Sequence, residues 1–525
     1  MCRTTPPSTT HALGVWSYRG CLRIGHSIQS RMTLTAVTFC NISQDFARSR
    51  NISQHSSRVP THPLIGLATP KQFLPQHLTR IAKHDFRAFF GPFFRQIHVN
   101  RCPSGVKKLH THYRNRLICI NAIAGRRTYC GRSSDRMSAS PLTSRKRVAL
   151  ALDHCEPDRV PYDLGGTIVT GIHRIAYERL RKHLGLLETK TEIEDPIQQL
   201  AVVEEDIKQR LLVDIYGVKP SKPRGIENPP RTEGGYHKLL DEWGVEWWMP
   251  VDGGLYFDMM RHPLSEAQEI ADVERYRFPN PLNPERFVGM AEQANDLLNR
   301  KQVAYALGRN SPGMFEISLW LRGFENFYCD MLVNVPMAEA VLDRVLEVKM
   351  AYWKRALEVV GENVMIVTEA DDLAGQDQCL VNPEVYRKLI KPRHTKLFSF
   401  IRKQAKAPVK IFYHSCGALL EIIPDLIESG IDILNPVQVS SPGMDTKELK
   451  RRFGKDLTFW GGGVDTQKIL PRGTPQQVRD EVRRRVDDLA PGGGFVFNTV
   501  HNCQPDVPPE NFMAMWETLQ EFGVY

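Results

Sequence analysis

The chain has 525 residues, of which 42% are hydrophobic and 24% are charged, proportions typical of a globular protein rather than a disordered or fibrous one. No run of about 18 apolar residues occurs, which argues against a transmembrane helix. The net charge of +10 is unequally distributed, because residues 1–136 have a balance of +18 and residues 137–525 a balance of −8, so the longer part gives no reason to expect nucleic-acid binding.

The first 136 residues are predicted to form a separate basic leader. They contain 21 Lys and Arg against 3 Asp and Glu and show no sustained apolar period, so we expect disorder there. Three interpretations are open: a nucleic-acid-binding arm, an organelle transit peptide, and upstream sequence translated from a misplaced start. The third is favoured, because the sequence from Met137 begins like a natural domain, with a polar cap, a basic amphipathic helix and a strand.

Cysteine usage divides the chain in the same place. Six of the eleven cysteines precede Met137, and the other five are scattered: Cys155, Cys329, Cys379, Cys416 and Cys503. This spacing is not that of a disulfide framework. A reducing compartment, and therefore a cytoplasmic location, fits it better and leaves thiolates available for metal binding or chemistry.

Short apolar runs alternate with amphipathic segments after Met137. The apolar runs predict strands at 159–165, 302–308, 363–370, 409–414, 432–437, 457–462 and 494–500. The segments between them predict helices at 172–184, 194–211, 285–300, 336–360, 383–404, 417–429, 475–489 and 509–522. Two of these helices begin with an N-cap residue followed by proline, at Asn382 and at Thr474.

Repeated strand–helix units predict an α/β fold with a parallel sheet, and about eight units predict a (β/α)8 TIM barrel. An open, doubly wound sheet is the rival architecture. Residues 234–264 contain turn residues between aromatic strands, which predicts a small β-hairpin insertion. We therefore expect one barrel domain over residues 137–525.

Polar residues follow one predicted strand after another. Because active sites of such barrels lie at the carboxyl ends of the strands, these residues are expected to share one mouth: Asp163, Asp371, Asp372, His414, Cys416, Gln438, Asp465, His501 and Cys503.

The segment "FYHSC" places His414 and Cys416 two residues apart at a strand end. In extended backbone both side chains point the same way. Zn²⁺ accepts imidazole nitrogen and thiolate sulfur, and a catalytic zinc site uses three protein ligands with one open position. Cys503, from a later strand, completes the predicted set. The alternative is a hydrogen-bonded loop histidine with two small buried thiols.

Three acidic residues are candidates for catalysis. Asp371 and Asp372 lie in "EADDLAG" at a strand end, where they could serve as acid or base, although a loop or N-cap aspartate is an equally plausible role. Asp214 is a lone acid within the apolar stretch "LLVDIYGV". Such a residue is either functional or paired with a buried base.

Several motifs together resemble the uroporphyrinogen decarboxylase superfamily. They are "LDHCEPDRVPYDLGG", "LLVDIYGV", "GRNSPGMFEISLWLRGFENFYCDMLVNVP", "VNPEVYRKLIKP", "HSCGALLEIIPDLIESGIDILNPVQ", "WGGGVDTQKILPRGTPQQV" and "GGGFVFNTVHNCQPDVPPENFMAM", and they extend over about 139–523. The resemblance implies a TIM barrel with its cleft at the carboxyl ends of the strands.

This superfamily contains two chemistries. Its decarboxylases use no cofactor, bind an acidic tetrapyrrole through an Arg-containing motif near the N-terminus, and place an Asp at the pyrrole nitrogens. Asp214 loosely matches that Asp, but the Arg motif is missing, since the region reads "DLGGTIVTGIHRIAYERL". The other branch consists of cobalamin-dependent methyltransferases with an H-x-C…C zinc pattern, which His414, Cys416 and Cys503 match.

The resemblance therefore predicts a zinc-dependent methyltransferase that moves a methyl group between a corrinoid and a small-molecule thiol. It implies Zn²⁺ as cofactor, and a corrinoid (cobalamin) as co-substrate or on a partner protein. Asp163, Gln438, Asp465 and His501 are predicted cofactor contacts. Asp214, Asp371 and Asp372 are predicted catalytic residues, with Asp371 or Asp372 taking the thiol proton or Glu369 adding a ligand. The alternatives are a cofactor-free uroporphyrinogen decarboxylase with a tetrapyrrole substrate and a non-catalytic corrinoid- or tetrapyrrole-binding barrel.

Overall fold

The computed structural model describes residues 141–187, 190–221 and 230–525. The predicted leader of residues 1–136 and its boundary at Met137 lie outside these residues.

The central feature is a curled parallel sheet of seven strands in the order β13-β12-β11-β10-β9-β8-β3. The strands are β3 (Ile215–Val218), β8 (Ala304–Leu307), β9 (Ile366–Ala370), β10 (Lys410–His414), β11 (Ile433–Asn435), β12 (Thr458–Trp460) and β13 (Phe495–Val496). Two parallel bridges, Tyr162 to Phe497 and Asp163 to Ile215, join the two edges. The segment around residue 162 therefore acts as the eighth strand and closes the predicted (β/α)8 TIM barrel.

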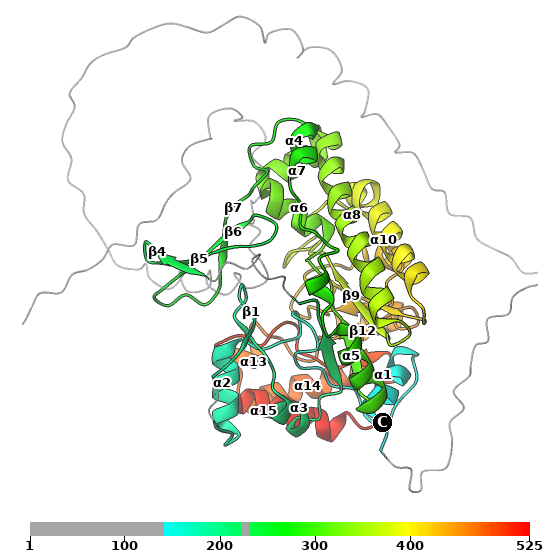
Figure 1. Ribbon diagram of the computed structural model, residues 1–525. Helices are drawn as coiled ribbons and strands as arrows, with labels where there is room; N and C mark the ends of the chain where they lie inside the picture. Colours follow the sequence, from blue (N-terminus) through cyan, green and yellow to red (C-terminus); the bar gives the residue numbers. More distant parts are fainter. Residues whose placement is uncertain (1–140, 188–189, 222–229) are drawn as a thin grey trace, which may run out of the picture. The chain divides into compact units, whose positions relative to one another are not determined.

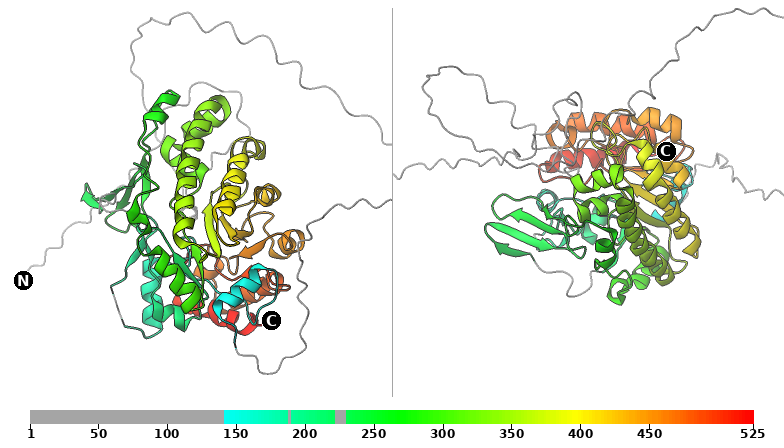
Figure 2. Two further views of the ribbon diagram at one scale, coloured as in Figure 1. Left: turned by 45° about the vertical axis from the view of Figure 1, so that its right-hand side comes forward. Right: turned by 90° about the horizontal axis from the view of Figure 1, so that it is seen from above.

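Helices cover the outside of this barrel (Figures 1 and 2). They include α2 (Arg174–His183), α5 (Met290–Asn295), α6 (Met314–Arg322), α7 (Phe324–Val333), α8 (Val335–Val360), α10 (Lys391–Gln404), α11 (Ile423–Ser429), α12 (Thr446–Phe453), α14 (Pro475–Leu489) and α15 (Pro509–Phe522). Local sequence explains several starts. Thr474 and Gln477 form a capping box at α14, with Pro475 at the first helical position, and Asp445 caps α12.

The strands separate two buried layers. Side chains on the outer face pack against the helices, whereas an inner cluster fills the barrel. Strand β10 illustrates the alternation, because Ile411 and Tyr413 belong to the outer layer and Phe412 to the inner one. His414 stands two residues after Phe412, so it points into the barrel as well.

Helix α1 (Ser144–Leu152) closes the amino-terminal end of the barrel. Its Val148 and Leu152 belong to the inner cluster. The Ala151 carbonyl accepts a hydrogen bond from Gly494, just before β13, at 2.9 Å. The opposite end, where the strands finish, is therefore the only end of the barrel at which the described residues leave room for a mouth.

The insertion is larger than the predicted hairpin at 234–264. It is a four-stranded antiparallel sheet of β4 (Arg231–Glu233), β5 (Tyr236–Leu240), β6 (Glu246–Pro250) and β7 (Asp258–Arg261), which projects beside the barrel (Figure 1). The two outer strands were missed because they are short and mostly exposed, so they lack an apolar alternation.

Two of the predicted helices differ most from the structure. The helix predicted at 194–211 is replaced by β1 (Ile193–Asp195), β2 (Leu200–Ala201) and α3 (Glu205–Arg210), because Asp195 accepts hydrogen bonds from the Ile197 and Gln198 amides and fixes a turn there. The helix predicted at 285–300 is divided into a 3₁₀ turn at Pro284–Phe287, α5, and a π turn at Asp296–Arg300.

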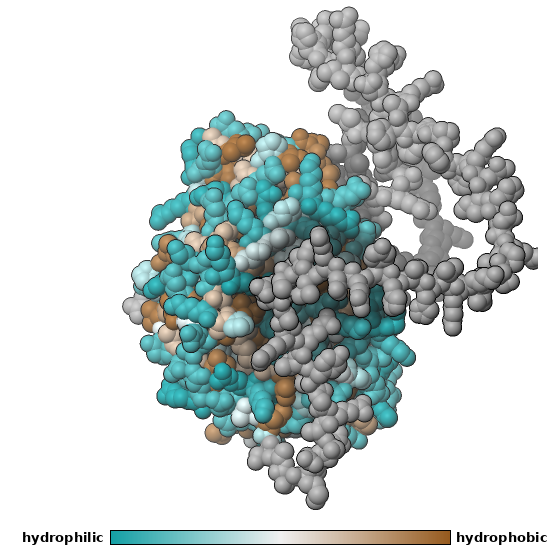
Figure 3. Space-filling view, turned by 90° about the vertical axis from the view of Figure 1, so that its right-hand side faces the viewer, coloured by the Kyte–Doolittle hydropathy of each residue, from teal (hydrophilic) through white to brown (hydrophobic). Residues whose placement is uncertain are grey.

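Within the described residues, no helix combines the length and apolar character needed to cross a membrane. The face drawn in Figure 3 is mainly hydrophilic, with apolar residues scattered in small groups.

Candidate metal centre

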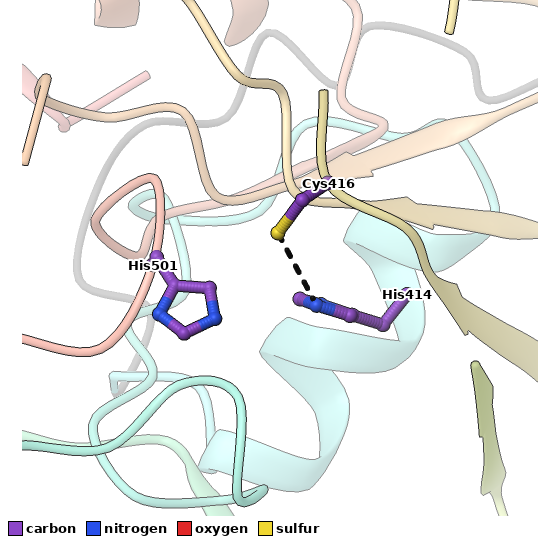
Figure 4. Close-up of side chains that lie close together, drawn as sticks. All are labelled: His414, Cys416 and His501. Atoms are coloured by element: carbon purple, nitrogen blue, oxygen red, sulfur yellow. Dashed lines mark hydrogen bonds between the residues drawn. The ribbon is translucent and has the colours of Figure 1, made fainter. Parts of the chain in front are cut away.

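Three potential metal ligands meet at the mouth of the barrel: His414, Cys416 and His501. One ligand atom from each lies within 4.8 Å of the other two, and all three residues are buried. His414 ends β10, Cys416 follows two residues later, and His501 lies in the loop after β13. The three side chains face a common space in Figure 4, where Cys416 Sγ is 3.5 Å from His414 Nε2.

A chain of hydrogen bonds fixes the tautomer of His414. The Trp460 carbonyl can only accept, and Asn435 Nδ2 donates to it at 2.8 Å. Asn435 Oδ1 therefore faces His414 Nδ1 at 2.6 Å, so Nδ1 must carry the proton and donate. The lone pair is left on Nε2, the nitrogen nearest to the thiol, as in metal sites where an outer hydrogen bond orients the histidine ligand.

Burial also keeps both imidazoles neutral. It lowers the pKa of His414 to about 3, with Arg309 contributing a smaller repulsion, and it lowers the pKa of His501 to about 3, with repulsion from His414 as the second cause. Neutral imidazole is the form that binds a metal. Two nitrogens and one sulfur are a donor set that suits zinc and leaves one position open, so the residues present fit the predicted ion.

Cys503, the third ligand predicted from the sequence, is not among the three residues whose ligand atoms converge. Its side chain is fully buried in the outer hydrophobic layer, and its backbone pairs with Ile172. The chain bends between Thr499 and Asn502, so His501 and Cys503 do not follow the alternation of an extended strand. His501, predicted as a cofactor contact, is the third member of the converging group.

The two adjacent aspartates of the β9 loop point in different directions. Asp371 is fully buried and accepts from the Phe315 and Glu316 amides at 2.9 and 2.8 Å, capping α6, and it pairs with His394 at 3.0 Å. This position is structural and does not fit its predicted catalytic role. Asp372 lies 3.8 Å from His414 Nε2 with its side chain 24% exposed, and burial raises its pKa.

Glu369 does not supply a further ligand. Its carboxylate pairs with Lys349 at 3.0 Å, and the two side chains are 1% and 0% exposed. It also accepts from the Trp353 indole. Lys349 in turn donates to the Pro312 carbonyl at 2.8 Å, so this buried pair supports the loop that follows β8.

The catalytic role predicted for Asp214 does not fit its position. It precedes β3 and therefore lies at the amino end of the barrel, opposite the mouth. Its fully buried carboxylate pairs with Arg147 at 2.7 Å and Arg159 at 2.8 Å and accepts from the Tyr162 amide. Its position matches the alternative stated in the sequence analysis, that of an acid paired with buried bases.

The other predicted cofactor contacts are held by neighbouring groups. Asp163 accepts from Trp460 Nε1 at 3.0 Å and from the Gly166 amide at 2.9 Å, and burial raises its pKa to about 6. Gln438 accepts from the Gly417 amide and donates to Gln376. Asp465 accepts from the Gln467 amide at 2.9 Å. All three lie in segments that end at the mouth, but none belongs to the ligand group.

A cavity of about 290 Å³ opens at the same end of the barrel. Its lining includes the loops that follow the segment around residue 162, β3 and β8. Thr368 of β9 and the turn between β5 and β6 also line it. Arg309, in the loop after β8, is among its lining residues and was missed from the sequence, although the strand-end rule covers "LGRN" as well. A more superficial hollow of about 430 Å³ lies near Cys379 and Arg452. Neither hollow is lined by His414, Cys416 or His501.

Comparison with known proteins gives a family match and several curated relatives. Residues 244–522 match the family described as "Uroporphyrinogen decarboxylase (URO-D)". The uroporphyrinogen decarboxylase of Geobacter sulfurreducens is 24% identical over 283 residues, covering 51% of this chain and 76% of the relative. That of Geobacter metallireducens is 26% identical over 284 residues, with the same two coverages.

Among solved structures, a methyltransferase from Methanosarcina mazei has a TM-score of 0.50 at 19% identity, over 73% of this chain and 99% of that chain. At this level of identity the likeness shows the fold.

Proposed function

Because the chain belongs to the uroporphyrinogen decarboxylase family, whose members are enzymes, we propose that it is the zinc-dependent methyltransferase-like kind, which moves a methyl group between a corrinoid and a small thiol. The observation that carries this proposal is the buried group of His414, Cys416 and His501. A cofactor-free decarboxylase has no need of a thiol and two neutral imidazoles converging at the mouth of its barrel.

Zinc held by these three residues would supply a Lewis acid that lowers the pKa of an acceptor thiol. The chain's own residues prepare the site. Asn435 orients His414, and burial keeps both histidines neutral. Asp372 lies beside His414 and is partly open to the mouth. Its raised pKa suits a group that takes up the thiol proton and releases it later.

The test is metal analysis of the purified chain and of matched variants. We expect about one zinc per chain, with about one sulfur neighbour near 2.3 Å and at least two nitrogen neighbours near 2.0 Å by X-ray absorption. Cys416→Ala and His501→Ala should each lose most of the metal. Cys503→Ala is the decisive control, because it should retain zinc if His501 is the third ligand, and Cys329→Ala, on α7, should also retain it.

Two outcomes would contradict this assignment. A wild-type chain purified without chelator and free of metal would remove the zinc proposal. Loss of zinc in Cys503→Ala with retention in His501→Ala would restore the set predicted from the sequence. Activity is then measured as demethylation of methylcobalamin in the presence of thiols, followed by the change in corrinoid absorbance.

Uroporphyrinogen decarboxylation is the second candidate, since the curated relatives carry that name. A tetrapyrrole with eight carboxylates needs several cations, whereas the described cavity is lined by Lys219, Arg286 and Arg309, two of which already pair with Glu194 and Glu242. We expect uroporphyrinogen to be a poor substrate. Chromatographic detection of coproporphyrinogen at ordinary enzyme rates would make this second candidate the function.

A further inference from the structure

Three glutamine side chains join neighbouring loops around the metal group. Gln376 follows β9, Gln438 follows β11 and Gln467 follows β12. Gln376 Oε1 accepts a hydrogen bond from Gln438 Nε2 at 2.7 Å and another from Gln467 Nε2 at 2.9 Å. Cys416 lies in the loop after β10, between the loops of the first two glutamines. The three amides therefore bridge the loops on both sides of a candidate metal ligand.

The Ser440 carbonyl fixes the orientation of these amides. A carbonyl can only accept, so Gln376 Nε2, which lies 3.0 Å from it, must be the donor. Gln376 Oε1 then faces the other two glutamines, and both must present their nitrogens to it. Gln438 therefore directs its Oε1 to the Gly417 amide, which donates to it at 2.8 Å. Each orientation follows from the one before it, and the series ends on the residue next to Cys416.

The turn after β10 lies directly against the loop after β9. The Ala418 amide donates to the Gly375 carbonyl at 2.9 Å. At Gly417, where φ is +95°, a side chain would place its Cβ only 2.4 Å from the same carbonyl oxygen. Glycine is the residue that permits this conformation and this close approach. A displacement of the loop after β9 would therefore displace the turn with it.

Side-chain oxygens engage both backbone amides that flank the Cα atom of Cys416. The Cys416 amide donates to Asp372 Oδ1 at 3.0 Å, and the next amide, that of Gly417, donates to Gln438. Together these contacts fix the backbone from which the thiol side chain projects. Its Sγ is directed toward His414 Nε2, 3.5 Å away (Figure 4). The direction of this sulfur therefore depends on the glutamine that holds the second amide.

We propose that Gln376 is a positioning residue of the metal centre, which acts through Gln438 and Gly417 on the direction of the Cys416 thiolate. This inference rests on the proposed function, because it assigns Gln376 a role in zinc binding. Metal ligands bind well only when their supporting contacts hold them near the bound geometry. Loss of the Gln376 amide should therefore weaken zinc binding although every ligand is still present.

The first experiment measures zinc affinity of the full chain by competition with a chromophoric chelator. Gln438→Met removes the acceptor of the Gly417 amide and should weaken zinc binding about 10- to 100-fold, and Gln376→Met, one contact further away, should weaken it about tenfold. Gln467→Met leaves the contact between Gln376 and Gln438 in place and should have a smaller effect than either. Gln376→Glu keeps an oxygen that accepts from Gln438 and should retain part of the affinity.

Two further measurements distinguish positioning from a general loss of stability. In the cobalt(II)-substituted chain, the near-ultraviolet charge-transfer absorbance reports the bond to the thiolate, and it should weaken or shift in Gln376→Met. Hydrogen exchange of segment 411–420, measured without metal, should be faster in this variant, because the Gly417 amide is held less well. Asn326→Leu is the matched control, since Asn326 on α7 donates to two backbone carbonyls at 3.0 and 3.3 Å. It should lower the urea midpoint and leave both signals unchanged.

The outcomes separate this inference from the proposed function. Wild-type zinc affinity in Gln376→Met, unchanged hydrogen exchange of segment 411–420, or an equal loss of zinc in Asn326→Leu would each overturn the role of Gln376. If Gln376→Met does not fold, Gln376→Glu and Gln438→Met are compared with the wild type in the same way. A metal-free wild type whose segment 411–420 exchanges faster in Gln376→Met would refute the zinc proposal. That result would leave Gln376 as the residue that holds the turn of Cys416.

Discussion

Replacement of Asn435 by Ala tests the orientation of the metal group without removing a ligand. Asn435 is fully buried and makes two hydrogen bonds, accepting from His414 Nδ1 at 2.6 Å and donating to the Trp460 carbonyl at 2.8 Å. The variant leaves the His414 ring free to rotate or to change tautomer. Rotation turns the Nε2 lone pair away from Cys416, and a change of tautomer replaces that lone pair with a proton.

The substitution is expected to have two separate effects, one on metal binding and one on folding stability. Loss of an outer hydrogen bond to a ligating histidine weakens metal binding about 10- to 100-fold, which corresponds to about 1.4–2.7 kcal/mol. The same change leaves a buried donor and a buried acceptor unsatisfied, at about 1–3 kcal/mol of folding stability each. Asn435→Ala should therefore lower both zinc affinity and the free energy of unfolding.

A matched variant separates the two effects. Asn511 is also buried and donates to two backbone carbonyls, those of Leu470 and Gly473, both at 2.8 Å. Asn511→Ala should reduce stability in urea by a similar amount and leave zinc affinity unchanged in competition with a chromophoric chelator. Equal zinc affinities for Asn435→Ala and the wild type would refute the tautomer argument.

Three further predictions concern stability. His173 accepts from the Ile175 amide at the start of α2, and burial lowers its pKa from 6.5 to about 4. The folded state therefore favours the neutral ring. This preference contributes up to about 3 kcal/mol to the free energy of unfolding; the contribution is complete above pH 6.5 and is lost as the pH falls through 4. His173→Asn keeps a capping side chain and should show a weaker pH dependence of urea unfolding between pH 7 and 4; an unchanged profile would count against this reasoning. Glu369→Gln leaves Lys349 buried without its counter-charge and should lower the free energy of unfolding by about 3–5 kcal/mol, whereas a loss below 1 kcal/mol would mean that the pair is not buried as described. A chain beginning at Met137 should unfold at the same urea midpoint as the full chain, because the basic leader has too little periodic apolar sequence to form a core; a lost transition would show that the leader belongs to the fold.

Alternation within strands made much of the site predictable. The strand predicted at 409–414 is β10 with nearly the same bounds, and the alternation that buries Phe412 inside the barrel also directs His414 inward. Cys503 was chosen because it follows a later strand, and the bend in the loop after β13 places His501 instead beside His414 and Cys416. Sequence spacing alone could not show that bend.

The position of Asp214 could not be predicted, for a different reason. The stretch "LLVDIYGV" was not assigned as a strand, so it could not be known that Asp214 stands before β3 rather than after it. The end of a strand at which a polar residue lies decides between a structural and a functional role in this fold. Arg147 and Arg159, which pair with Asp214, lie more than 50 residues away in sequence, so no local pattern revealed them.

Helix α1, which closes the amino end of the barrel, has a kinetic consequence. Val148 and Leu152 lie within the inner cluster and close that end. Under the proposed function, both reactants therefore enter the barrel through the mouth at the carboxyl ends of the strands. If the methyl donor is carried by a partner protein that covers this mouth, the small acceptor must bind before the partner does. The acceptor also cannot dissociate until the partner has dissociated. Such a geometry imposes a compulsory order of arrival, so excess partner protein should trap or exclude the acceptor and inhibit turnover in competition with it.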